Sequence, residues 1–152
     1  RDRQDSKLLR NNWKQLLLRK TKALILCSPS NPTGSVYSKE ELAGLAAVLA
    51  KYPQVVVIAD EIYEHIKLYR CTSEHCSVPG MKERTVIVNG VSKAYAMTGW
   101  RIGFIAGPEW IVKACNKLQG QYTSGPCSVS QESCRGCLRR YTRTGERNAE
   151  GI

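Results

Sequence analysis

Short apolar runs recur along the middle of this 152-residue chain, each bounded by polar or turn-forming residues. Four of them, at 23–27, 55–59, 86–88 and 102–106, are rich in aliphatic and β-branched side chains and short enough for single strands. The run at 55–59 is apolar without interruption, which is typical of a strand that is covered on both faces of a sheet. The pattern therefore predicts four strands.

Two amphipathic stretches predict helices between and after these strands. Ser38 and Glu41 have the spacing of a capping box at the start of the first helix, and Tyr52-Pro53 ends it. Pro108 begins the second helix. The apolar residues at helical spacing are Leu42, Leu45, Ala46 and Leu49 in the first helix, and Ile111, Ala114, Cys115, Leu118 and Tyr122 in the second. Alternating strands and helices predict an α/β fold with a mostly parallel sheet flanked by helices.

The formal net charge of +10 raises the question of nucleic-acid binding. Residues 1–22 carry +6 of this charge, whereas 23–131 and 132–152 carry +2 each. The excess therefore lies mainly outside the strand-and-helix region, and no aromatic interleaving or known nucleic-acid motif accompanies it. We expect no nucleic-acid partner.

The length suits one domain and is sufficient to bury a core. No apolar run approaches the roughly 20 residues that cross a membrane, so we expect no membrane partner. The first residues are basic, but no apolar stretch with a cleavage site follows them. We therefore expect no signal peptide and a cytoplasmic location.

The seven cysteines do not form a convincing framework. Cys134 and Cys137 have the spacing of a redox or metal pair, but no second pair or histidine cluster supports them. Cys71 and Cys76 flank a loop-like stretch with His75, where scattered reduced thiols are the simpler interpretation. We expect no metal and no structural disulfide.

Polar segments follow the first three predicted strands. Asn31-Pro32-Thr33-Gly34 comes after the first strand, Asp60-Glu61-Ile62-Tyr63-Glu64 after the second, and Ser92-Lys93 after the third. Ligands of open α/β sheets bind beyond the carboxyl ends of parallel strands, so these segments are candidates for one site. Each also has a purely structural interpretation. The first is an ordinary turn, Asp60 could cap a helix, Tyr63 could pack in the core, and Lys93 and Arg101 could be solvated charges.

Together the three segments resemble the lysine, aspartate and asparagine motifs of the class I/II aminotransferases. These are the pyridoxal-phosphate (PLP) enzymes of the aspartate aminotransferase family, of fold type I. The stretch from Tyr95 to Arg101, Tyr-Ala-Met-Thr-Gly-Trp-Arg, looks most like the bacterial-type aspartate aminotransferases. The resemblance covers about residues 21–131, which corresponds to the second half of the large, cofactor-binding domain of a much longer enzyme.

The resemblance implies a role for each candidate residue. Lys93 would hold the PLP aldehyde as a Schiff base and move a proton between the substrate's α carbon and the cofactor. A carboxylate beside the pyridine nitrogen keeps the ring electron-withdrawing, and an arginine fork matches a phosphate. The implied cofactor contacts are Asp60 with the ring nitrogen, Asn31 and Tyr63 with the phenolic oxygen, and Ser92 and Arg101 with the phosphate. In the family the strand after Arg101 runs antiparallel, which brings its start to the same edge as the other motifs.

The two ends of the chain depart from the family pattern. Residues 1–22 form an atypical basic segment, and 132–152 form an atypical tail where the family has an alanine-rich helix. We interpret one or both ends as sequence read out of frame or as part of a damaged gene.

The resemblance thus predicts part of an aminotransferase that moves an amino group between an aspartate-like amino acid and a 2-oxo acid. Full-length members of the family are homodimers. The alternative is an inactive remnant that binds PLP weakly or not at all.

Overall fold

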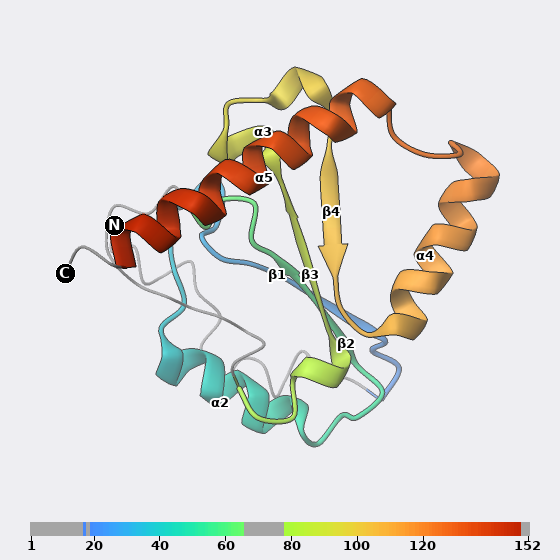
Figure 1. Cartoon of the computed structure of the whole chain (residues 1–152). Coiled ribbons are helices and arrows are strands. Elements are labelled where there is room, and N and C mark those ends of the chain that lie inside the picture. Colours follow the sequence, from blue (N-terminus) through green and yellow to red (C-terminus); the bar gives the residue numbers. More distant parts are fainter. Residues whose placement is uncertain (1–16, 18, 66–77, 150–152) are drawn as a thin grey trace.

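The computed structural model describes residues 17, 19–65 and 78–149 (Figure 1). Four strands form one sheet in the order β1-β2-β3-β4, in which β1 to β3 are parallel and β4 is antiparallel to β3. The predicted α/β class, the mostly parallel sheet and the antiparallel fourth strand are therefore confirmed. The strands are β1 Ala23–Cys27, β2 Val56–Asp60, β3 Thr85–Gly90 and β4 Gly103–Ala106. The helices are α2 Lys39–Leu49, α3 Val91–Ala94, α4 Glu109–Tyr122 and α5 Ser128–Ala149, with short 3-10 helices at Lys82–Arg84 and Thr98–Trp100.

Helix α2 begins at the predicted capping box. The backbone N–H of Ser38 donates to the Glu41 carboxylate at 2.6 Å, and the Glu41 N–H donates to the Ser38 hydroxyl at 3.2 Å. The helix then packs its apolar face on the sheet and forms the main core. That core contains Leu17, Leu26, Tyr37, Leu42, Leu45, Val48, Leu49, Val55, Val57 and Met81. Leu17 belongs to it although it lies in the segment that the sequence marks as atypical.

Arg84 forms hydrogen bonds at the C-terminal end of α2. Its guanidinium donates to the backbone carbonyls of Leu49, Tyr52 and Val55. These carbonyls lie where α2 ends and the chain turns into β2, so one side chain ties this turn to the start of β3. Burial lowers the pKa of Arg84, and the three carbonyls supply the hydrogen bonds that such a charge needs away from water.

The sheet is covered unevenly. In β2, Val57 and Ala59 are buried, whereas Val56 and Ile58 on the opposite face are only half-buried. Ile25 pairs with Ile58 on that face and is 71% exposed. The prediction that the second strand is covered on both faces is therefore wrong within the described part of the chain, because α2 covers only the face of Leu26 and Val57.

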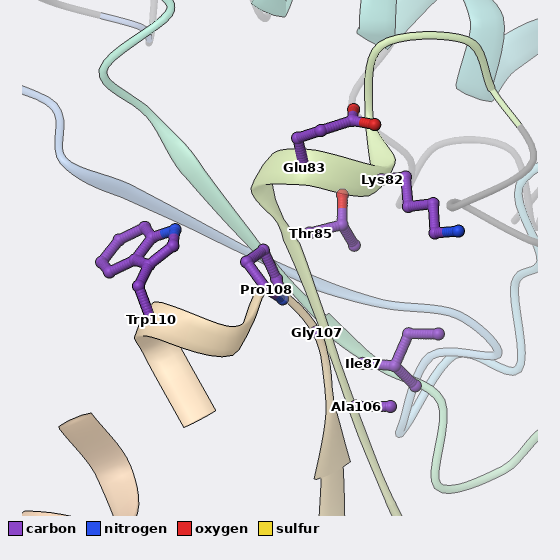
Figure 2. Close-up of a pocket in the computed structure, with 8 residues that line it drawn as sticks. All are labelled: Lys82, Glu83, Thr85, Ile87, Ala106, Gly107, Pro108 and Trp110. Atoms are coloured by element: carbon purple, nitrogen blue, oxygen red, sulfur yellow. The ribbon is translucent and has the colours of Figure 1, made fainter. Parts of the chain in front are cut away.

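Helix α4 forms as predicted, but none of its residues is buried. Leu118 and Tyr122 of its apolar stripe are 62% and 85% exposed. Beside its start, the beginning of β3 and the end of β4 border an apolar cavity of about 720 Å³, to which Trp110 and Ile87 contribute (Figure 2). Among the described residues, no helix is long and apolar enough to cross a membrane.

Helix α5 crosses the end of the sheet where β3 leads into α3 (Figure 1). It continues from Ser128 to Ala149 across the boundary that the sequence places at 131, although its composition is unlike the alanine-rich helix expected there. Cys134 packs against Val91 and Ile102 in a second, smaller core. The Tyr95 hydroxyl donates to the carbonyl of Cys137 at 3.4 Å. The small core therefore joins α5 to the segment that carries Lys93.

Five cysteines lie among the described residues, and all are free thiols. No group of three potential metal ligands occurs in the same part of the chain. Cys71, His75 and Cys76 lie outside the described residues. Among the described residues, no disulfide therefore contributes to the fold.

Candidate active site

The loop after β1 carries the first candidate residue. The N–H of Ser30 donates to the Ser35 carbonyl at 2.9 Å, and the N–H of Gly34 donates to the Ser30 carbonyl at 2.7 Å. Gly34 has a φ of 68°, a conformation that glycine adopts without strain. These contacts close a tight turn beyond the carboxyl end of β1, and Asn31 lies on it.

Asn31, Tyr63 and Lys93 come together although they follow three different strands. The Asn31 amide donates to the Tyr63 hydroxyl at 2.9 Å. The Lys93 ammonium lies 5.7 Å from the centroid of the Tyr63 ring, within the range of a cation–π contact. The three polar segments found in the sequence therefore meet at one edge of the sheet, as the topology predicts.

Asp60 is the last residue of β2 and is half-buried. Its carboxylate accepts the backbone N–H of Ile62 at 3.2 Å. Turn residues rather than a helix follow it as far as His65, so Asp60 does not cap a helix in this stretch. The carboxylate instead holds a turn at the strand end.

Asp60, Ser92 and Arg101 line one cavity of about 330 Å³. Ser92 lies in α3, directly after β3, and Arg101 lies just before β4. Arg101 adopts a φ of 55° and donates to the Thr98 carbonyl at 2.9 Å, which turns the chain into β4. An anionic carboxylate and a cationic guanidinium thus border the same small cavity.

Glycine lets the ends of β3 and β4 approach closely at this cavity. A Cβ atom on Gly90 would lie 2.8 Å from the carbonyl oxygen of Ile102 and 3.1 Å from the Cα of Gly103. Real Cβ contacts are not so short, so a side chain at position 90 would push the two strands apart. The approach places the start of α3 beside the residues that follow Arg101.

The six candidate residues form two groups. Asn31, Tyr63 and Lys93 form one contact chain, and Asp60, Ser92 and Arg101 form the cavity. Lys93 itself is exposed and does not line the cavity. The groups are joined through the backbone, because Ser92 precedes Lys93 and Asp60 lies three positions before Tyr63.

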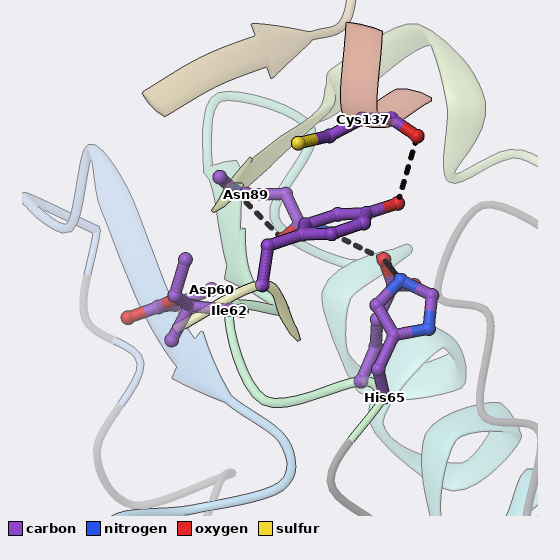
Figure 3. Close-up of polar contacts among 8 residues, drawn as sticks. Asp60, Ile62, His65, Asn89 and Cys137 are labelled. Carbon is purple, nitrogen blue, oxygen red and sulfur yellow. Dashed lines mark hydrogen bonds and ion pairs between the residues drawn. The ribbon is translucent and has the colours of Figure 1, made fainter. Parts of the chain in front are cut away.

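Asn89 lines the same cavity and was missed by the sequence analysis. Its amide donates to the carboxylate of Glu64, and the N–H of Gly90 donates to its side-chain oxygen at 2.7 Å (Figure 3). The signal was present as a single polar residue between an apolar strand and the glycine before Ser92 and Lys93. Its partner lies 25 positions away, which no local pattern indicates.

The fold and this edge define an α/β domain with a candidate ligand site at the carboxyl ends of its parallel strands. The family model for aminotransferases of class I and II matches residues 1–151. The chain belongs to the class I and II aminotransferase family, as the sequence motifs predict. Members of this family are PLP-dependent, act on amino acids and 2-oxo acids, and are typically oligomeric.

Named relatives agree with this family. The chain is 52% identical over 135 residues to a bifunctional aspartate aminotransferase and glutamate/aspartate-prephenate aminotransferase of Petunia hybrida, covering 88% of this chain and 27% of the relative. It is 54% identical over 114 residues to an aspartate aminotransferase of Pinus pinaster, covering 74% of this chain and 23% of the relative. The chain therefore spans about a quarter of the length of these curated relatives.

A solved structure supports the fold. The aspartate aminotransferase of Rhizobium meliloti superposes with a TM-score of 0.79 at 42% sequence identity, covering 86% of this chain and 34% of that one. The described sheet and its helices therefore have the arrangement of part of an aminotransferase.

Proposed function

We propose that this chain is the part of an aspartate-type aminotransferase that holds PLP, with Lys93 as the residue that binds the cofactor covalently. The observation that carries the proposal is the meeting of Lys93, Tyr63 and Asn31 at the sheet edge that also carries the cavity lined by Asp60 and Arg101. The names of the relatives support an aspartate-like amino acid and a 2-oxo acid as substrates. Because the chain spans only about a quarter of these relatives, we assign the activity to a longer protein that contains it.

The residues of this edge fit PLP in their chemistry. The cofactor presents a phosphate and a protonated ring nitrogen, and the cavity offers a guanidinium with a hydroxyl for the first and a carboxylate for the second. The amine of Lys93 and the Asn31–Tyr63 pair lie at the same edge of the sheet. When bound, PLP would supply an electron sink for the pair left on the substrate's α carbon.

Each residue would then have one task. Arg101 and Ser92 would bind the phosphate, and Asp60 would keep the proton on the ring nitrogen. Asn31 and Tyr63 would donate toward the phenolic oxygen. The hydrogen bond from the Asn31 amide to the Tyr63 oxygen would fix the orientation of the Tyr63 hydroxyl. Once the substrate's own amine has displaced it from the cofactor, the free Lys93 amine would be placed to accept the proton from the substrate's α carbon.

The covalent role of Lys93 can be tested on the chain itself. We expect borohydride reduction in the presence of PLP to leave a stable label, and peptide mapping to place it on Lys93. Lys93→Ala should abolish the label, whereas the matched variants Lys113→Ala and Lys117→Ala, both on α4, should keep it. A label that maps elsewhere, or no label at saturating PLP, refutes the proposal and favours the inactive remnant.

Two variants test whether the Asp60 carboxylate contacts the cofactor or only holds the turn at the end of β2. Asp60→Ala should leave the label on Lys93 but raise the PLP concentration that half-saturates it by about tenfold to a hundredfold, since a charge-assisted hydrogen bond is worth roughly 1.5–3 kcal/mol. Asp60→Asn keeps an acceptor for the Ile62 N–H and removes the charge. If Asp60→Asn binds PLP like the unmodified chain, the carboxylate serves only the turn.

Turnover should require more than this chain. It spans about a quarter of its relatives, and substrate positioning contributes much of an enzyme's rate. We expect a coupled assay of the isolated chain with aspartate, 2-oxoglutarate and PLP to give less than about a tenth of the roughly 10 per second of a median enzyme. A higher rate contradicts the dependence on a longer protein. In such a protein we also propose a homodimer, and the cytoplasmic location stays a prediction from the sequence.

A further inference from the structure

One buried side chain joins the two strand ends of the candidate site. Asn89 is 7% exposed and precedes the last residue of β3. Its amide nitrogen donates to the carboxylate of Glu64, which follows Tyr63 directly. Its amide oxygen accepts the N–H of Gly90, three positions before Lys93. A single amide therefore bonds at both ends to the chain segments that carry the candidate site.

One carboxylate oxygen of Glu64 has two partners. Its carboxylate accepts from Asn89 and lies 3.1 Å from the His65 imidazole nitrogen (Figure 3). Backbone contacts bring the same segments together one step earlier, where the Glu61 N–H donates to the Val88 carbonyl at 3.0 Å. The Asn89–Glu64 pair adds a side-chain contact between the same two segments.

The pair also has a polar character that packing alone does not require. An apolar side chain at the end of an apolar strand fills space without needing a partner, whereas a buried amide is costly unless it is hydrogen-bonded. Asn89 borders the cavity with Asp60, Ser92 and Arg101, so a change in its position moves the wall of the candidate site.

We propose that Asn89 and Glu64 form a clamp that sets the position of Lys93 relative to Tyr63 and Asp60. Asn89 acts as a positioning residue, because its contacts are to Glu64 and Gly90 and it influences the cofactor only through the segments they belong to. The inference rests on the proposed function, since it concerns the readiness of Lys93 to bind PLP.

The direction of the hydrogen bond gives a sharp test. Asn89→Asp keeps the acceptor for the Gly90 N–H but sets a carboxylate against Glu64, so the two repel. Glu64→Gln removes the charge and supplies an amide donor. In the double variant, the glutamine amide donates to the aspartate carboxylate, which restores the bond with its direction reversed. Asn116→Asp on exposed α4 is the matched control for the charge change.

The first readout is the PLP concentration that half-saturates the borohydride-fixed label on Lys93, measured with the pH midpoint of labelling. We expect Asn89→Asp to raise the concentration about tenfold and to move the pH midpoint, because losing a bond to a charged group costs that order. The double variant should return within about threefold of the unmodified chain, and Asn116→Asp should change nothing. Equal labelling of Asn89→Asp and the unmodified chain, or a double variant as weak as Asn89→Asp, overturns the clamp.

Two measurements separate the remaining outcomes. If urea unfolding shifts in Asn89→Asp while the labelling midpoints stay fixed, the pair is structural and the clamp is refuted. If the unmodified chain takes no label on Lys93, the proposed function fails, and amide hydrogen exchange at Glu64, whose bond to Asn89 is the one that Asn89→Asp breaks, then decides the clamp. Exchange should accelerate in Asn89→Asp and slow again in the double variant. If Asn89→Asp and the unmodified chain exchange at the same rate, the proposed clamp is refuted.

Discussion

Helices α2 and α4 belong to the same α/β unit and are both amphipathic, but only α2 buries its apolar face. Leu42, Leu45 and Leu49 are no more than 2% exposed on α2, whereas Leu118 and Tyr122 are more than half exposed on α4. Both stripes are visible in the sequence. Periodic spacing thus predicts a helix and its apolar face, but it does not predict whether the chain in hand supplies the surface that covers the face.

The largest difference should appear in the stability contributed by each helix. Leu45→Ala removes a side chain that is 1% exposed, so it should lower the free energy of unfolding by about 2–5 kcal/mol. Leu118→Ala removes a mostly exposed side chain and should cost less than about 0.5 kcal/mol. Urea unfolding followed by circular dichroism measures both. Equal costs would mean that α4 is covered in solution, for example by a second copy of the chain.

Arg84 sharpens the comparison on the α2 side. Arg84→Met keeps much of the apolar stem but removes the donors to three backbone carbonyls, so unfolding should become easier by about 2 kcal/mol. Arg135→Met, on α5, breaks an exposed pair with Glu132 and should cost less than about 0.5 kcal/mol. The same unfolding experiment applies. A small effect at Arg84 would show that water replaces its bonds to the end of α2.

Two cysteines at different depths test the packing of α5. The backbone N–H groups of Ser130 and Val129 lower the pKa of exposed Cys127, whereas burial raises the pKa of Cys134. The thiolate is the reactive form, so Cys127 reaches it at a lower pH and Cys134 at a higher pH than an ordinary thiol. Between pH 7 and 8, iodoacetamide should modify Cys127 on the order of tenfold faster, as read by peptide mass spectrometry. Comparable rates would show that α5 separates readily from α3.

The smallest expected effect concerns the start of α2. Ser38→Ala removes one half of the capping box and should lower the free energy of unfolding by about 1 kcal/mol. Ser133→Ala in the second turn of α5 removes only a bond to a carbonyl of the same helix and should be nearly neutral. A neutral Ser38→Ala would mean that Glu41 or water caps the helix alone.

The strand pattern and the capping box could be read from the sequence because both depend on residues close together in the chain. The first and last residues of the strands could be predicted only to within one or two positions, since Val55 and Ile102 look like strand residues and lie just outside β2 and β4. The sequence did not indicate how many faces of the sheet are covered by helices. The apolar run that contains Val56 and Ile58 is the same whether one face or both faces are packed.

The candidate site divides in the same way. Motif resemblance proposed Lys93, Asp60 and Tyr63 as candidates, and the order of strands predicted that their segments meet. The pairing of Asn89 with Glu64 depends on how two distant loops turn after their strands, and local sequence does not specify that. The separation of the six residues into a contact chain and a cavity likewise follows from three-dimensional placement.

The contact between the ends of β3 and β4 restricts which mutations the chain can accept. Every amino acid other than glycine carries a Cβ atom, and at position 90 that atom meets the backbone of Ile102 and Gly103 rather than a flexible side chain. No replacement there is conservative, whatever its size or polarity. In a saturation library scored for folded protein, position 90 should therefore tolerate no residue besides glycine, whereas Gly120 on exposed α4, with no atom within 4 Å of its Cβ, should tolerate most.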